Sequence, residues 1–263
     1  MQTGTYLLAD VSVEISSIYD EVHLMCADYR TDRPAELHIA TTAEEIEEES
    51  RMSDEQRAAE GLPPYRYEAP YLETLTVYRK LATLLMERGV LLMHGSVIAV
   101  DGEGYLFTAL SGTGKSTHVR LWRRLFGKRA VMVNDDKPLV RVASHSTLFT
   151  PQTPQTPQTP HSSFRPLVYG TPWDGKHHLS NNIVVPLKAI VFLERGVENE
   201  IRAVDAKWIF PVLMQQTFHT DDPMGTLRVM QMLGTLAQGV KFYDLHCNMN
   251  PEAAEVAYNG MNI

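Results

Sequence analysis

The sequence is poor in cysteine and carries more acidic than basic residues. It has two cysteines in 263 residues, Cys26 and Cys247, which lie far apart and form neither a metal-ligand pattern nor a disulfide framework. We therefore expect two buried, reduced thiols, as is usual in a cytoplasmic protein. The formal net charge of -8 argues against general binding to nucleic acids or membranes, because both carry dense negative charge.

Long apolar runs are missing as well. No stretch reaches the roughly 18 apolar residues that a membrane helix needs. The N-terminus lacks the basic segment and apolar run of a signal peptide, so we expect a cytoplasmic protein. Hydrophobic residues still make up 44% of the chain, which is enough for a large core in one large domain or two small ones.

Apolar patterning predicts a β-rich N-terminal subdomain, residues 1–70, before an α/β core, residues 71–263. Short strands are expected in the first part at residues 5–8, 11–15, 22–25 and 36–39. The acidic segment Glu44–Glu49 is followed by more acid and little apolar content as far as Gly61. This composition predicts a solvated face or a mobile loop.

The core begins with a predicted helix, because apolar residues recur at helical spacing from Tyr71 to Glu87. Strands are expected within residues 90–100, 105–109, 130–133, 139–142, 189–193 and 241–245, and helices at residues 115–126, 206–217, 224–237 and 251–258. The run Thr150–Pro160 repeats Pro-Gln-Thr. Its regular proline predicts an extended surface loop, or alternatively a docking segment for a proline-recognising partner.

One segment, Ala109-Leu110-Ser111-Gly112-Thr113-Gly114-Lys115-Ser116, fits the phosphate-loop pattern, with alanine where the first glycine usually stands. Small residues let the backbone wrap a phosphate with its N–H groups inward, and the following helix adds its positive N-terminal end. Lys115 supplies a mobile charge for the β- and γ-phosphates, and the Ser116 hydroxyl can ligate Mg²⁺. The expected nucleotide-binding residues are Ser111, Gly112, Thr113, Gly114, Lys115, Ser116 and Thr117.

Two carboxylates, Asp135 and Asp136, follow the apolar run Ala130–Val133. Ligands of open α/β sheets bind at the carboxyl ends of strands, so a strand beside the loop would aim one of these acids at the γ-phosphate. One aspartate can hold Mg²⁺ and the other can accept a proton from a substrate hydroxyl. The alternative is a surface turn. His94, just before the loop's strand, either orients a carboxylate, touches phosphate or is a core residue.

Two further segments allow alternative interpretations. The turn Gly170–Gly175 has no helical period, and its Trp173 either covers a substrate or plugs the core. The neighbouring His177 and His178 would point in different directions on a strand, which disfavours a metal site. A basic run on and after the loop's helix predicts a solvated face, or alternatively an electrostatic guide for an acidic or phosphate-bearing substrate. Its members are Arg120, Arg123, Arg124, Lys128 and Arg129.

The order of three motifs along the chain, the His94 segment, the glycine loop and the paired aspartates, resembles that in the catalytic domain of HPr kinase/phosphorylase. The fold of that domain is related to that of ATP-dependent phosphoenolpyruvate carboxykinase. The resemblance covers roughly residues 90 to 195 and is carried by His94-Gly95-Ser96-Val97, Ser111–Ser116 and Asp135-Asp136. The chain also looks like uncharacterised HPr-kinase-like proteins of bacterial gene clusters, which include kinases that modify peptides during lasso-peptide maturation. Gly170-Thr171-Pro172-Trp173 and Lys188–Arg195 carry that likeness.

The resemblance implies an α/β fold of the HPr-kinase and carboxykinase type. It implies that Asp135 is the general base, with His94 beside it and Ser116 on the metal. We expect Asp136 to be the aspartate that holds the metal with Ser116. The family's Glu-x-Arg-Gly-Leu-Gly signature is missing, and Tyr169–Gly175 occupies about its place. HPr itself is therefore not implied as the substrate.

We expect a Mg²⁺- and ATP-dependent kinase that transfers the γ-phosphate to a serine-type hydroxyl of a peptide, protein or small molecule. One alternative is an enzyme of phosphorolysis or decarboxylation on the same scaffold. Another is a slow ATPase that acts as a nucleotide-gated binding or chaperone protein. A third is a nucleotide-binding accessory protein of a peptide-modification system. The sequence leaves open the acceptor, the phosphate donor and whether the chain forms a homo-oligomer.

Overall fold

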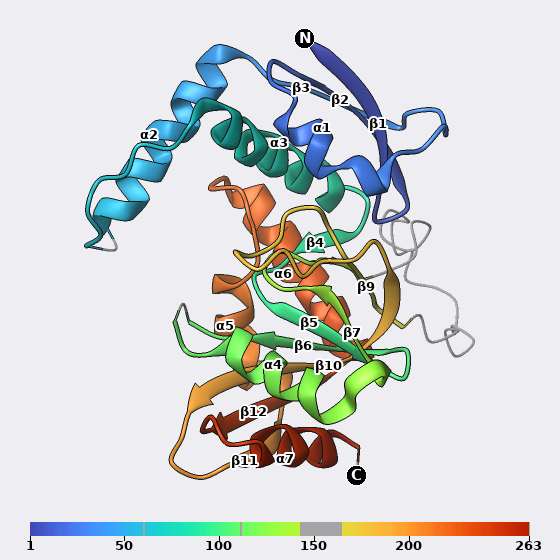
Figure 1. Ribbon diagram of the computed structural model, residues 1–263, viewed down its shortest axis with the longest axis vertical. Coiled ribbons are helices and arrows are strands. Elements are labelled where there is room, and N and C mark those ends of the chain that lie inside the picture. The colour runs from blue at the N-terminus through green and yellow to red at the C-terminus, as the bar shows by residue number, and fades with distance from the viewer. Residues whose placement is uncertain (60, 111, 143–164, 263) are drawn as a thin grey trace, which may run out of the picture. The chain divides into compact units, whose positions relative to one another are not determined.

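The computed structural model describes residues 1–59, 61–110, 112–142 and 165–262 (Figure 1). Within it the chain divides into two compact units, Met1–Leu84 and Leu85–Ile263. The division lies later than residue 70, because helix α3 (Ala69–Met86) forms hydrogen bonds with earlier residues of the first unit. Its buried Glu73 accepts the backbone N–H of Ile18 at 2.7 Å and that of Tyr19 at 2.8 Å. The Pro-Gln-Thr repeat lies outside the described residues.

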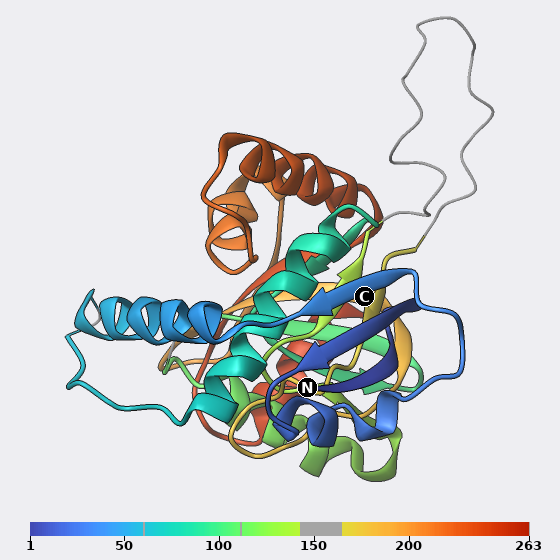
Figure 2. The same ribbon diagram turned by 90° about the horizontal axis from the view of Figure 1, so that it is seen from above.

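The first unit contains a small sheet in the order β1-β2-β3, whose strands lie side by side in Figure 2. Strand β1 (Gln2–Leu8) pairs antiparallel with β2 (Val11–Ser17), and β2 pairs parallel with β3 (Leu37–Ala40). Alternate residues of β2, such as Val13 and Ile15, are fully buried. This alternation is typical of strands with one buried face, and it confirms three of the four strands expected here.

One expectation for this unit was wrong, and another was confirmed in one of its two alternatives. Residues 22–25 form part of helix α1 (Glu21–Met25) and not a strand, because a four-residue run with three apolar residues fits one helical turn as well as a strand. The acidic segment forms helix α2 (Ala43–Ala59), most of whose residues are exposed, so it is a solvated face and not a mobile loop. Its Ile46 and Glu49 are buried three positions apart on one face, and Glu49 accepts a hydrogen bond from Arg79 at 2.7 Å. The first unit is therefore mixed and not simply β-rich.

Among the described residues, the second unit forms one mixed sheet of nine strands. The strands are β4 (Val90–Leu92), β5 (Ser96–Val100), β6 (Glu103–Thr108), β7 (Ala130–Asn134), β8 (Leu139–Arg141), β9 (Leu167–Tyr169), β10 (Val184–Arg195), β11 (Glu200–Val204) and β12 (Lys241–Cys247). Along β4-β8-β9-β10-β6-β5-β7 each strand pairs with the next, and β12 joins β10 to the edge strand β11. All the strands expected in this unit are present. The expected α/β class is therefore confirmed.

Helices cover both faces of this sheet: α4 (Lys115–Phe126), α5 (Ala206–Gln215), α6 (Pro223–Gly239) and α7 (Glu252–Met261). Strand residues alternate between two cores. Leu106 packs in a cluster with residues of α5 and α6, whereas its neighbours Tyr105 and Phe107 pack with residues of α4 and α7. None of the described helices is long and apolar enough to cross a bilayer.

The strand directions place the carboxyl ends of several strands at one edge of the sheet. Strands β6 and β7 both run antiparallel to β5, which lies between them, and β10 runs parallel to β6 and to β12. The carboxyl ends of β6, β7, β10 and β12 therefore lie at the same edge of the sheet. The start of β5 lies there too, since that strand runs the opposite way.

Candidate functional site

The glycine loop connects the end of β6 to the start of α4, in the strand–loop–helix order that phosphate binding requires. Gly112 and Gly114 have φ angles of 74° and 127°, a region that favours glycine. The Lys115 ammonium donates to the Ala109 carbonyl at 3.1 Å. Burial lowers the pKa of Lys115, and the nearby Asp136 carboxylate opposes that shift. Ser111 lies outside the described residues.

Arg195, which sequence reasoning missed, braces the loop from the end of β10. Its guanidinium donates to the carbonyl of Gly112 at 2.6 Å and to that of Thr113 at 3.1 Å. Two carbonyls of the loop are therefore occupied by protein, while the N-terminal amides of α4 have no earlier helical turn to bond. The sequence offered one signal for Arg195: it lies just after a predicted strand, at the carboxyl end where ligands of α/β sheets bind.

A cavity of about 740 Å³ opens beside the loop, within the usual size range of small-molecule sites. Its wall includes residues of the loop, of α4, of the end of β7 and of the turn after Gly175. The predicted residues that it brings together are Gly112, Gly114, Lys115, Ser116, Thr117 and Asp135. The residues expected to bind phosphate and a carboxylate therefore line one space.

The Asp135 carboxyl group is held in this wall by the backbone N–H of Gly175, which donates to it at 2.7 Å. Only 9% of Asp135 is exposed, and burial raises its pKa, aided by the charges of Asp174 and Asp136. A Cβ at position 175 would stand 3.0 Å from the Asp135 carboxylate, so glycine permits this approach. The result is a buried carboxyl group with a raised affinity for a proton.

The expectation that His94 stands beside Asp135 was wrong. His94 Nε2 lies 3.3 Å from the carboxylate of Asp136, and its Nδ1 lies 2.9 Å from Gln216 Oε1. Burial alone would raise the pKa of Asp136. The hydrogen bond with His94 and the charges of Lys137, His94 and Lys115 outweigh that effect and lower it. The paired aspartates thus have opposite shifts, because the strand end turns one toward the cavity and the other toward His94.

Asn134, which the sequence analysis did not single out, shapes this turn. Its side-chain oxygen accepts the backbone N–H of Asp136 at 2.8 Å and that of Lys137 at 2.6 Å. Its amide donates to Thr171 and to the carbonyl of Trp173. An asparagine before a polar turn is a known signal for such bonds, and this one fixes Asp135 and Asp136 on the sheet edge.

The segment after β9 carries the remaining candidate residues, of which some are buried in the core and others line the cavity. Trp173 is 5% exposed and is not part of the cavity wall, which favours the core plug over a substrate cover. Gly170 is enclosed so tightly that a Cβ there would stand 1.9 Å from the Asn181 carbonyl oxygen and 2.6 Å from that of Val133. His177 lines the cavity, while His178 lies 2.9 Å from Asp174. The two histidines therefore diverge, as expected.

The basic run divides as well. Arg120 and Arg123 line the cavity, whereas Arg129 donates to Asp101 at 2.9 Å. Arg124 and Lys128 are exposed, as a solvated face requires. Lys176 and His177 add to the basic part of the wall.

No protein-family model matches the chain, and no curated protein matches it.

Proposed function

We propose that this protein is a Mg²⁺- and ATP-dependent kinase, with a phosphate-loop core similar to that of HPr kinase, that phosphorylates a hydroxyl group. One observation carries the proposal: Lys115, Ser116 and Asp135 line the same cavity at the end of the glycine loop. A phosphate-binding lysine, a metal-binding hydroxyl and a basic carboxylate are the groups that phosphoryl transfer to an alcohol requires.

The loop supports the binding half of this proposal. The α4 N-terminus begins at Gly114–Lys115 and presents backbone N–H groups and a positive partial charge to an anion. Arg195 holds the carbonyls of Gly112 and Thr113, so these carbonyl dipoles are engaged by protein and not turned toward a phosphate. Lys115 needs only to release the Ala109 carbonyl in order to reach a phosphate oxygen.

Asp135 is the proposed general base. An ordinary aspartate is a weak base at neutral pH, and a pKa raised toward the working pH improves proton transfer. Burial raises the pKa of Asp135 in this direction, and the Gly175 N–H fixes the orientation of the carboxylate. His94 acts on the other carboxylate, Asp136, whose lowered pKa keeps it ionised.

The chemistry of the available donors fits Mg²⁺, which prefers oxygen ligands. The Ser116 hydroxyl lies in the cavity wall. The ionised Asp136, which contacts His94 and lies next to Asp135 outside that wall, would hold the ion together with Ser116. When bound, Mg²⁺ neutralises charge that develops on the transferred phosphoryl group. The protein's own part is to keep one carboxylate charged and the other basic.

The cavity wall favours an anionic acceptor. Arg120 and Arg123 on α4 and Lys176 and His177 on the turn surround the space beside Asp135. The chain as a whole carries a net charge of -8, so this basic wall is a local feature. A serine flanked by acidic residues would match its charge, and charge complementarity raises both association rate and specificity.

Phosphate transfer from labelled ATP to an array of serine peptides with acidic flanks tests the proposal. Lys115→Ala should remove the rise in melting temperature that Mg²⁺-ATP causes, while the free protein stays folded. Asp135→Asn should keep ATP binding and lower transfer by 10² to 10⁴, about the usual worth of a positioned base. Asp101→Asn, at the exposed pair with Arg129, is the matched control.

The outcomes separate the alternatives. Transfer that survives in Asp135→Asn but not in Asp136→Asn would move the base to the second position, and transfer that survives in both would exclude a carboxylate base. Tight ATP binding without transfer to any peptide would favour a nucleotide-binding accessory protein. No ATP binding by the parent protein would overturn the proposal entirely.

A further inference from the structure

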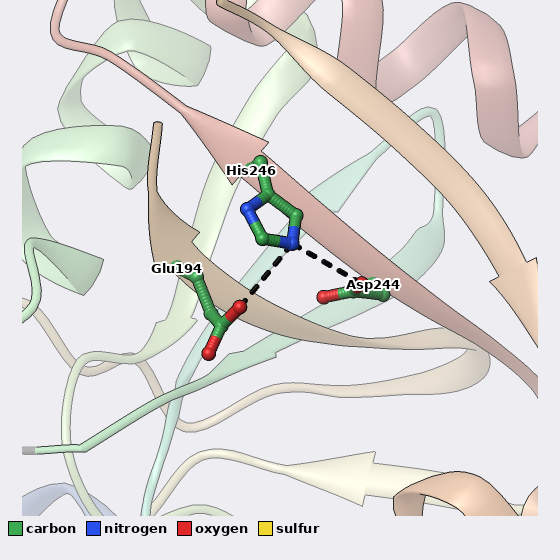
Figure 3. A group of neighbouring side chains, drawn as sticks. All are labelled: Glu194, Asp244 and His246. Atoms are coloured by element: carbon green, nitrogen blue, oxygen red, sulfur yellow. Dashed lines mark ion pairs between the residues drawn. The ribbon is translucent and has the colours of Figure 1, made fainter. Parts of the chain in front are cut away.

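Three side chains with metal-ligating atoms converge at the carboxyl ends of β10 and β12 (Figure 3). Glu194 pairs in register with His246 across these parallel strands. Asp244 stands two residues before His246, so the alternation of a strand places both on the same face. That face is the one of Phe192 and Phe242, which pack with α5 and α6, whereas α4 covers the opposite face.

The distances within this group suit a small ion. His246 Nε2 lies 3.2 Å from the Glu194 carboxylate and 3.3 Å from that of Asp244. One potential ligand atom from each residue lies within 4.8 Å of the others. Ligand bonds of about 2.0 to 2.1 Å around tetrahedral Zn²⁺ separate neighbouring donor atoms by roughly 3.3 Å. The two distances from His246 already match that separation, and the Glu194 and Asp244 ligand atoms lie within 4.8 Å of each other.

Asp244 provides an independent indication of a cation. It is fully buried, and its Oδ2 receives Arg202 at 2.7 and 2.8 Å as well as His246. Its Oδ1 is buried without a hydrogen-bond partner. An unsatisfied buried carboxylate oxygen is costly, and a cation bound through both oxygens of Asp244 would satisfy Oδ1. Figure 3 shows the Asp244 carboxylate turned toward the other two side chains.

We propose that Glu194, Asp244 and His246 bind one Zn²⁺ ion, at a site separate from the proposed Mg²⁺ position. A single imidazole with two carboxylates favours Zn²⁺ over Mg²⁺, which is usually bound through oxygen alone. Three protein ligands leave the fourth position for water, and Arg202 holds the ligating Asp244 as an outer partner. Glu194 and His246 have side chains 45% and 42% exposed, which leaves the ion a route from solvent.

The site is tested on the full chain after removal of metal with a chelator. Calorimetric titration with Zn²⁺ should give one ion per chain, and the absorption of Co²⁺ in the same site should be that of a tetrahedral centre. Glu194→Gln and His246→Asn should each weaken Zn²⁺ binding at least tenfold, because the first removes the charge of one ligand and the second removes the imidazole. His38→Asn, which removes another histidine beside a glutamate, should change nothing. Lys115→Ala should also retain Zn²⁺, so this result is independent of the proposed kinase activity.

A second measurement uses the parent protein alone and does not depend on the folding of a variant. Diethyl pyrocarbonate should modify His246 in the chelated protein, and Zn²⁺ should protect it, as read by peptide mass mapping. The proposal is overturned if the parent binds no Zn²⁺, or if His246→Asn binds it as tightly as the parent. Protection of other histidines in place of His246 would overturn it as well.

Discussion

The guanidinium of Arg195 donates to the backbone carbonyl of Gly112 at 2.6 Å, joining the end of a central strand to the glycine loop. If this contact keeps the loop in the form that binds the nucleotide, Arg195→Ala should weaken Mg²⁺-ATP binding about tenfold or more, since a hydrogen bond to a charged group contributes about 1.5 kcal/mol or more. Calorimetric titration measures this loss. Arg129→Ala removes an exposed arginine elsewhere and should bind ATP like the parent. Equal affinities for all three proteins would show that the loop holds its shape without Arg195.

The basic cavity wall predicts selective effects on the acceptor. Reversing Arg120 and Arg123 to glutamate should raise KM for an acidic serine peptide by tenfold or more, and the increase should shrink at high salt because screening weakens such contacts. The pair Arg124→Glu and Lys128→Glu changes the same charge on exposed positions of the same region. If both double variants raise KM equally, net charge and not the cavity wall governs the acceptor.

Because His118 is buried, we expect the protein to lose stability in mild acid. Burial lowers its pKa to about 4 from an ordinary 6.5, and its Nε2 accepts the Trp122 N–H at 3.0 Å. The unfolded chain therefore takes up a proton between pH 6.5 and 4 that the folded chain does not. The free energy of unfolding should fall as pH drops through that window, by on the order of 3 kcal/mol in total.

Urea unfolding at several pH values measures this effect. His118→Gln keeps an acceptor for Trp122 and cannot titrate, so the slope of its stability between pH 6.5 and 4 should be shallower than that of the parent. Its absolute stability is not the readout, because the substitution also changes packing. Parallel slopes would assign the acid sensitivity to other groups.

Both thiols should be inert in the folded protein. Burial raises the pKa of Cys26 to about 12 and that of Cys247 to about 11, and the thiolate is the reactive form. At pH 8, iodoacetamide should label neither residue in native protein within an hour and both in guanidinium chloride, as followed by mass spectrometry. Rapid native labelling of either cysteine would show that its burial is transient.

The sequence predicts elements well where burial alternates with the period of the element. Helix α4 has the expected bounds, because its apolar residues form one stripe under a polar face. Helix α2 was missed, because acidic residues dominate it and only Ile46 and Glu49 are buried among its members. Strand β11 was missed for a similar reason: no residue of this edge strand is buried, and its pairing with β12 defines it.

In the candidate site, the sequence likewise predicted residues that belong to continuous motifs but not contacts that depend on the tertiary structure. Lys115 and Asp135 belong to motifs that are continuous in sequence, so their place beside a common cavity followed from the order of strand, loop and helix. The partner of His94 did not follow, because the turn made by Asn134 decides which aspartate it meets. Glu194 and His246 are brought together by strand register alone, which no local pattern in the sequence encodes.

Gly170 places an unusual limit on how this sequence can change. The atoms that would collide with a side chain there are backbone oxygens of Asn181 and Val133, which every amino acid carries. No substitution at those two positions can make room, so a mutation at Gly170 has no local second-site suppressor. Natural variants and engineered libraries should therefore keep glycine at position 170 unless the whole loop is rebuilt. Loss of this glycine would indicate that a related sequence no longer has the same fold here.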